Sequence, residues 1–169
     1  LVADADTGGR AAVGLARKLI FAVAIAWSLF QLWYASPLPF TLGWGVLNDT
    51  EARSLHLGVG LLLAFLCYPG MSTAWQRAHI PWIDWLLALT AAFAGAYFLF
   101  FYTQLSPRRG QPNLQDVVIA TIGLLLLLEA TRRAVGMPMT VLAILFLVYI
   151  LLGRYLPEVL AHKGASWER

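Results

Sequence analysis

The sequence predicts an all-α integral membrane protein, a bundle of about five transmembrane helices (four to five) whose N-terminus is cytoplasmic. Composition gives the first reason, because 60% of the residues are hydrophobic and only 12% are charged. Soluble domains carry about 25% charged residues. The second reason is that three apolar runs of near-membrane length, at 19–35, 86–102 and 137–153, contain no charged residue. The chain therefore lacks the polar surface that a soluble domain of this size needs.

The first predicted helix covers residues 19–35 and follows a polar, cytoplasmic tail at residues 1–14. Pro37 and Pro39 end this helix, because proline cannot continue the helical hydrogen-bond ladder. Residues 40–53 are then predicted to form a loop. The second helix covers residues 55–68, and residues 51–53 extend it to membrane length. A polar turn follows at residues 72–81.

The third predicted helix covers residues 83–102, and a loop follows at 103–115. Asn113, placed three residues before Asp116, predicts the start of the fourth helix, with a carboxylate in its first turn. The fourth apolar run covers 117–128, and the fifth helix covers 137–153. The transmembrane domain thus extends over 15–153, and 154–169 is predicted to be an amphipathic interfacial segment.

The orientation depends on the positive-inside rule, which counts Lys and Arg in loops. Five crossings place six basic residues on each side, so the total decides nothing. The first helix usually dominates, and Arg17 and Lys18 precede it while Asp49 and Glu51 follow it. We therefore expect the N-terminus in the cytoplasm. Basic residues that stand singly or in pairs between apolar runs set orientation, and we expect no nucleic-acid partner.

Glu129, Arg132 and Arg133 form the cluster that most resembles a functional site. Spacings of three and four residues place their side chains on one helix face, where they can pair. One interpretation is a proton or ion relay inside the membrane. The interpretation that we favour is a structural ion pair that also contacts a neighbouring helix or lipid headgroups.

Aromatic and small residues predict contacts of a simpler kind. Trp82 and Trp85 are expected at the membrane interface as structural or interface contacts. Small residues recur every four positions in the apolar runs and predict close helix packing. They are Ala22 and Ala26, Gly60 and Ala64, and Ala88, Ala92 and Ala96.

No set of residues in the sequence argues for catalysis, so we expect the chain not to be an enzyme. Cys67 is the only cysteine, which excludes an internal disulfide and a cysteine-rich metal site. His56 and His79 stand at opposite ends of the second crossing, so they do not suit a haem with two histidine ligands. We expect no catalytic residue, bound metal or bound cofactor in this chain.

Several segments, in order and spacing, resemble one family over essentially the whole chain. They are LVADADTGGR at 1–10, SLFQL at 28–32, PLPF at 37–40, RSLHLG at 53–58, PWIDWLL at 81–87, LEATRRAVG at 128–136 and GRYLPEVLAHKGASWER at 153–169. These segments are similar to the small membrane domain (Q-type) of fused tripartite ATP-independent periplasmic (TRAP) transporter permeases, and within them to the TAXI-type subfamily.

The resemblance implies a multi-pass protein of the bacterial inner membrane that acts as the fixed scaffold of an ion-gradient-driven symporter. A large permease domain (M-type) would bind the substrate and the coupling ion, with Na⁺ favoured over H⁺. A periplasmic substrate-binding protein would deliver the substrate, for which organic anions are the expected class. Residues 154–169 resemble the segment that leads into the large domain, which this sequence does not contain. No ligand residue is transferred to this chain, and membrane lipids are its other expected partner.

Two alternatives to the scaffold follow from the residues themselves. The chain could be the membrane anchor subunit of a redox or other membrane enzyme complex. It could also be an embedded enzyme, which would require Glu129 or His56 to line a cavity with another polar group.

Overall fold

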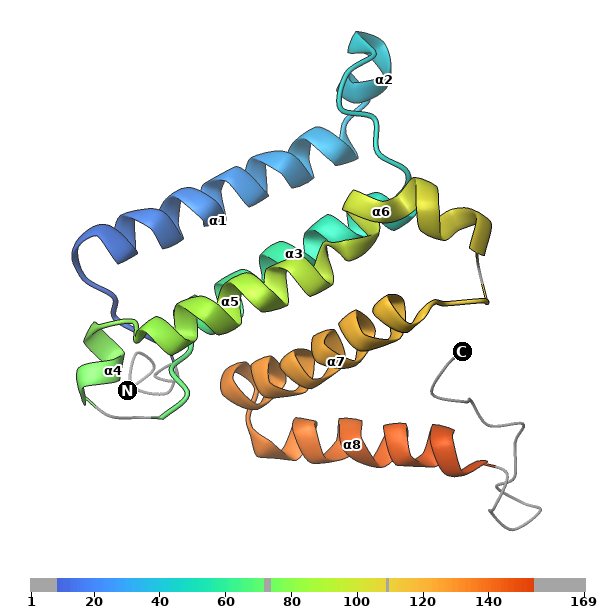
Figure 1. Cartoon of the computed structure of the whole chain (residues 1–169). Helices are drawn as coiled ribbons and strands as arrows, with labels where there is room; N and C mark the ends of the chain where they lie inside the picture. Colours follow the sequence, from blue (N-terminus) through green and yellow to red (C-terminus); the bar gives the residue numbers. More distant parts are fainter. Residues whose placement is uncertain (1–8, 72–73, 109, 154–169) are drawn as a thin grey trace.

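The computed structural model describes residues 9–71, 74–108 and 110–153. Within these ranges every regular element is a helix (Figure 1). In chain order they are α1 (Gly14–Ala35), α2 (Leu38–Leu42), α3 (Asp49–Cys67), α4 (Ala74–Ala78), α5 (Trp82–Gly95), α6 (Tyr97–Leu105), the 3-10 turn η1 (Ser106–Arg108), α7 (Leu114–Ala134) and α8 (Met137–Leu152).

Four helical segments are long and apolar enough to cross a membrane: Gly14–Ala35, Asp49–Cys67, Trp82–Arg108 and Leu114–Ala134. The fifth apolar helix, α8, has 16 residues and is shorter than these spans. The predicted all-α membrane fold is therefore confirmed, and the four long helices indicate a membrane protein. The side of the membrane that holds the N-terminus stays a prediction.

The long helices lie roughly side by side, with α3 and α5 at the centre (Figure 1). Helix α1 packs against α3, while α7 packs against both α3 and α5, and α8 contacts α7 on the outside. The buried core lies where α3, α5 and α7 meet, and it comprises Leu61, Phe65, Leu66, Ala88, Ala91 and Ala130. Helix α1 has no fully buried residue, and α8 buries only Thr140. Both flanking helices therefore present apolar surface outward.

Helices α3 and α5 approach most closely at two glycines. A Cβ atom added at Gly58 would lie 2.8 Å from the carbonyl oxygen of Ala92, and one added at Gly95 would lie 2.8 Å from the Cα of Gly58. Real Cβ atoms do not approach backbone so closely, so this contact requires glycine on both helices. The predicted close packing of small residues is present, with Gly58 rather than Gly60 at the crossing.

The predicted third helix over 83–102 is present within the span Trp82–Arg108, but it is broken, because α5 ends at Gly95 and α6 begins at Tyr97. The buried hydroxyl of Ser54 donates to the carbonyl oxygen of Gly95 at 2.8 Å and accepts from the amide of Leu99 at 3.2 Å. The Ser54 hydroxyl thus lies between the carbonyl oxygen of Gly95 and the amide of Leu99, which a continuous helix would join. The Leu99 amide also donates to the carbonyl oxygen of Ala96 at 3.0 Å. A side chain inserted into the hydrogen-bond ladder is a recognised cause of helix kinks.

Two predicted boundaries also need correction. Residues 40–53 are not a continuous loop, because α2 occupies 38–42 and α3 begins at Asp49. Asn48 accepts from the amide of Glu51, and Glu51 accepts from the amide of Asn48, which fixes this start as a capping box. The predicted polar turn at 72–81 contains the short helix α4. The predicted start near Asn113 is confirmed by a second capping box, which Asn113 forms with Asp116.

The predicted tail at 1–14 is described only from Gly9 onward, and α1 already begins at Gly14. The predicted interfacial segment at 154–169 lies outside the described residues.

Candidate functional site

Five charged side chains form an ion-pair network at the end of the bundle where α1 and α5 begin and α3 and α7 end. We call this network the arginine cluster; its members are Arg10, Asp84, Glu129, Arg132 and Arg133. The cluster joins the segment before α1 to the first turn of α5 and the last turns of α7.

Asp84 is the centre of the arginine cluster. It occupies the third position of α5, and its side chain is only 6% exposed. Its Oδ2 accepts from Nη2 of Arg10 at 2.5 Å, and its Oδ1 accepts from Nη1 of Arg133 at 2.8 Å. The two arginine side chains are 0% and 6% exposed. One buried carboxylate therefore connects cations from two distant segments of the chain.

Glu129 extends the same network within α7. Its carboxylate accepts two bonds from Arg132 and one from Nε of Arg133, each at 2.7 Å. The structure thus forms the pairing that the spacing predicts. Arg133 donates to Asp84 as well and so joins the two carboxylates. Three guanidinium groups and two carboxylates leave the cluster one positive charge in excess.

Arg10 also connects the segment before α1 to two other segments by hydrogen bonds. Its amide donates to the carbonyl oxygen of Cys67 at 2.6 Å, at the end of α3. Its Nη1 donates to the carbonyl oxygen of His79 at 2.6 Å, just before α5. Its Nε is buried and has no hydrogen-bond partner. One residue therefore holds three segments together at this end of the bundle.

The neighbours of Arg133 fit its guanidinium closely. The guanidinium carbon lies 4.8 Å from the centre of the Phe65 ring, which is a favourable cation–π distance. A Cβ atom at Gly70 would lie 3.0 Å from Nη2 of Arg133, so glycine leaves room for that group. The carbonyl oxygen of Gly70 accepts from Arg132 at 3.3 Å. This close fit is typical of a structural contact.

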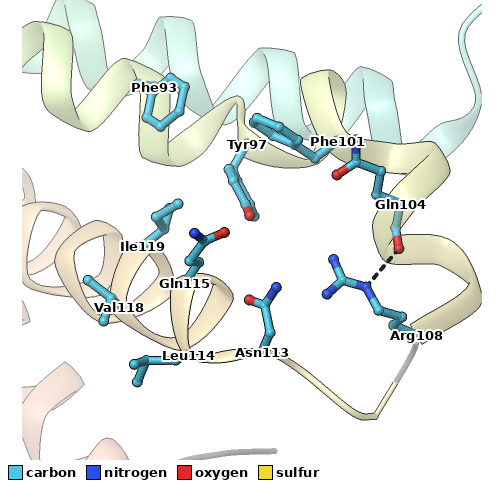
Figure 2. Close-up of a pocket in the computed structure, with 10 residues that line it drawn as sticks. All are labelled: Phe93, Tyr97, Phe101, Gln104, Arg108, Asn113, Leu114, Gln115, Val118 and Ile119. Carbon is cyan, nitrogen blue, oxygen red and sulfur yellow. Dashed lines mark hydrogen bonds between the residues drawn. The ribbon is translucent and has the colours of Figure 1, made fainter.

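The opposite end of the bundle contains an open cavity of about 460 Å³ between α5–α6 and α7 (Figure 2). Its lining residues are Phe93, Tyr97, Phe101, Gln104, Arg108, Asn113, Leu114, Gln115, Val118 and Ile119. Figure 2 shows Arg108 and Gln104 at one end of the cavity and Phe93, Val118 and Ile119 at the other. The cavity therefore has a polar end and an apolar end.

Asp116 lies beside this cavity and is 7% exposed. Its Oδ1 accepts from the hydroxyl of Tyr97 at 2.7 Å, and its Oδ2 accepts from the amide of Asn113 at 3.0 Å. Nη1 of Arg108 lies 3.7 Å from Oδ2, which is an ion pair but too long for a hydrogen bond. Asp116 is thus bonded to the capping residue of its own helix and to Tyr97 of α6, 19 residues before it.

The predicted contacts Trp82 and Trp85 lie in the first turn of α5, on either side of Asp84. Trp82 is 74% exposed, whereas Trp85 packs against the buried core. Their place at a membrane interface stays a prediction.

Two residues of the arginine cluster, Asp84 and Arg10, were not predicted as site residues from the sequence. A lone carboxylate in the first turn of an otherwise apolar helix was the available signal for Asp84.

The groups considered for catalysis or ligand binding do not gather into one site in the described residues. The ring of His56 contacts Trp27 edge-on at 4.9 Å between centroids, within the α1–α3 interface. It does not line the cavity, and Glu129 lies at the other end of the bundle. Among residues 9–71, 74–108 and 110–153 no group of three metal-ligating side chains occurs.

Comparisons with protein-family models, with curated proteins and with solved structures give no match to this chain.

Proposed function

We propose that this chain is the static, membrane-anchoring small domain of a TRAP-type secondary transporter in the bacterial inner membrane. In this proposal an ion gradient, with Na⁺ favoured over H⁺, drives the uptake of organic anions. A large permease domain binds the ion and the substrate, and a periplasmic substrate-binding protein delivers the substrate. The sequence segments described above, which resemble those of TRAP permeases, support this choice of family.

The observation that most supports a static role is the tight fastening of the α3–α5–α7 core. Glycines allow α3 and α5 to touch at backbone distance, and the arginine cluster ties α5, α7 and residue 10 together at one end. Buried ion pairs and close backbone contacts resist sliding of one helix against another. A scaffold against which another domain moves requires such a fixed body.

The two flanking helices supply surface for a partner. Along α8 most side chains are exposed and apolar on every side, including Leu145 at 60% and Phe146 at 58%. Along α1 the same holds for Phe21 at 67% and Leu32 at 69%. In a membrane such faces contact either lipid or another helix bundle. The proposal assigns the large permease domain to part of this surface.

Co-purification tests the proposal directly. The full chain carries a tag at residue 1, is expressed in its native host and is extracted in mild detergent. We expect a large multi-helix membrane protein to co-purify, or the chain to be recovered as the first part of a longer polypeptide. A lone 18.6 kDa species would contradict the proposal. Recovery with a coloured cofactor or a soluble enzyme would favour the alternative, an anchor subunit of a redox or other membrane enzyme complex.

Substitution of Glu129 distinguishes a scaffold role of this chain from an ion-relay role. In E129Q the glutamine keeps the shape and one acceptor oxygen but loses the charge that pairs Arg132 and Arg133. A scaffold role predicts less assembled complex but unchanged uptake per assembled complex. An ion relay predicts normal assembly with lost uptake, which would contradict our proposal. D49N is the matched control, because Asp49 pairs only with exposed Arg53 among the described contacts.

A further inference from the structure

We propose that the cavity between α5–α6 and α7 binds an acidic phospholipid. The lipid phosphate would contact the guanidinium of Arg108, and one acyl chain would lie along Phe93, Val118 and Ile119. The proposal concerns the end of the bundle opposite the arginine cluster. It does not depend on the transporter role, because it follows from the shape and chemistry of this cavity alone.

The polar end of the cavity offers hydrogen-bond donors and a positive charge. Nε of Arg108 donates to the carbonyl oxygen of Gln104 at 3.0 Å, while its terminal nitrogens point into the cavity (Figure 2). Oδ1 of Asn113 accepts from the amide of Asp116 at 2.8 Å, which leaves the amide NH₂ of Asn113 to donate. A phosphate, with several acceptor oxygens, matches donors arranged in this way.

The carboxylate of Asp116 lies 3.7 Å from Nη1 of Arg108 and offsets part of its charge, so the preference for an anion rests on which of the two groups a ligand can reach. Both oxygens of Asp116 already accept hydrogen bonds, from Tyr97 and from the backbone of Asn113. Asp116 is 7% exposed and is not among the residues that line the cavity, whereas Arg108 lines it and its side chain is 38% exposed. The accessible charge at the polar end is therefore that of Arg108.

The apolar end of the cavity favours a lipid over a small soluble anion. Phe93 and Val118 belong to two spans of membrane length and are 48% and 47% exposed. In a bilayer these surfaces face hydrocarbon, so the cavity opens toward acyl chains on one side and carries a guanidinium on the other. An amphiphile with an anionic head fits both ends at once, and membrane phospholipid is the abundant amphiphile of this kind. Basic pockets between transmembrane helices are known to bind lipid headgroups.

Native mass spectrometry tests this proposal on the full chain. Delipidated protein in detergent is titrated with dioleoylphosphatidylglycerol or with dioleoylphosphatidylcholine, and apparent affinities are compared. We expect the acidic lipid to bind more tightly, and R108Q to weaken its binding by about tenfold, the effect of one lost charge-assisted hydrogen bond. R53Q is the matched control, because it removes an exposed charge from the same end of the bundle but outside the cavity.

A second variant tests the apolar end independently. V118W fills the cavity from a half-exposed position, so it changes the binding site without crowding the buried core. We expect it to weaken phosphatidylglycerol binding while leaving the unfolding free energy unchanged. Inorganic phosphate at millimolar concentration should compete poorly, because it lacks the chain.

Four outcomes would overturn the proposal. Equal losses in R108Q and R53Q would show that only overall charge matters. Equal binding of the two lipids would remove the role of the anionic head. Full competition by phosphate would assign the cavity to a free anion. A dimer that V118W abolishes, whether lipid is present or not, would assign it to a second copy of the chain.

Discussion

Asp84 and Asp116 each occupy the third position of an apolar helix, and each is nearly buried, at 4% and 7% exposed. Asp84 accepts from two guanidinium groups that belong to residues 10 and 133. Asp116 accepts from a hydroxyl and a backbone amide, both within 19 residues of it. The same residue type in the same helical position thus performs two tasks. At one end it joins segments far apart in the sequence through two arginines, and at the other it caps its own helix and bonds to the preceding helix α6.

The difference shows that ion pairs close one end of the bundle, whereas the other end contains an open cavity. In the arginine cluster both carboxylates are paired with arginines, and the segment before α1 is held there by the ion pair between Arg10 and Asp84. At the other end Asp116 accepts from its own helix cap and from Tyr97 of α6, and its ion pair with Arg108 is long, at 3.7 Å, so the guanidinium of Arg108 is also directed into the cavity. The buried guanidinium groups of Arg10 and Arg133 hold the fold and are not available for ligands. The guanidinium of Arg108 is partly exposed and its ion pair is longer, so it can still bind a ligand.

The largest effect is expected from D84N. The substitution leaves Arg10 and Arg133 buried without their shared counter-charge, and breaking a buried pair in this way costs about 3–5 kcal/mol. SDS titration in mixed micelles, followed by tryptophan fluorescence, measures the change in unfolding free energy. D49N, which breaks an exposed pair, should cost less than about 1 kcal/mol. Equal costs for the two variants would contradict the central role of Asp84.

A smaller effect is expected from G58A, which tests the contact that connects the two ends. The new methyl group would meet the Ala92 carbonyl oxygen at 2.8 Å, so α3 and α5 must separate. Overpacking of this kind costs about 1–3 kcal/mol. The same titration on G60A gives the control, because a Cβ at Gly60 meets nothing within 4 Å. Alanine there should be neutral or stabilising, since glycine disfavours helix. A stable G58A protein would mean that the helices cross elsewhere.

A still smaller effect is expected from D116N. Asparagine keeps one acceptor oxygen for the capping box or for Tyr97, but not the charge, so the cost should be about 1 kcal/mol. Hydrogen exchange should show faster exchange at the start of α7 and, because Tyr97 bonds to Asp116, at the start of α6. Faster exchange also in α5 near Asp84 would contradict the separation of the two ends.

The smallest effect on stability is expected from R108Q. Its side chain is partly exposed and 3.7 Å from Asp116, so the unfolding free energy should change by less than about 1 kcal/mol. The same variant is expected to lose lipid affinity, which separates binding from folding at this end. If SDS titration shows a loss as large as that of D84N, Arg108 holds the fold and is not free to bind a ligand.

Features that depend on residues near each other in the sequence could be predicted. The helix start at Asn113 and the pairing of Glu129 with Arg132 and Arg133 follow from spacings of three and four, and both are present. The four to five apolar helices follow from composition and run length.

Features that depend on distant residues could not be predicted in the same way. The Arg10–Asp84 contact joins residues 74 positions apart, and nothing in either segment specifies the other. At the break between α5 and α6 the carbonyl oxygen of Gly95 accepts from Ser54, which lies 41 residues before it. Gly95 is the only local signal of the break, and a single glycine inside an apolar run does not by itself predict an interruption. The cavity likewise takes its lining residues from two separate segments, 93–108 and 113–119.

The break at Ala96 also bears on how the chain fits bilayers of different hydrophobic thickness. The segment Trp82–Arg108 has 27 residues. As one straight helix it would be about 40 Å long, whereas the hydrocarbon layer is about 30 Å thick. Because α3 and α5 are fixed together at Gly58 and Gly95, mismatch cannot be relieved by tilting α5 alone. Bending at Ala96 and at Phe101, whose backbone angles are both non-helical, would instead change the depth that the end of this segment reaches, so that a thinner or thicker bilayer is accommodated there while the core keeps its geometry.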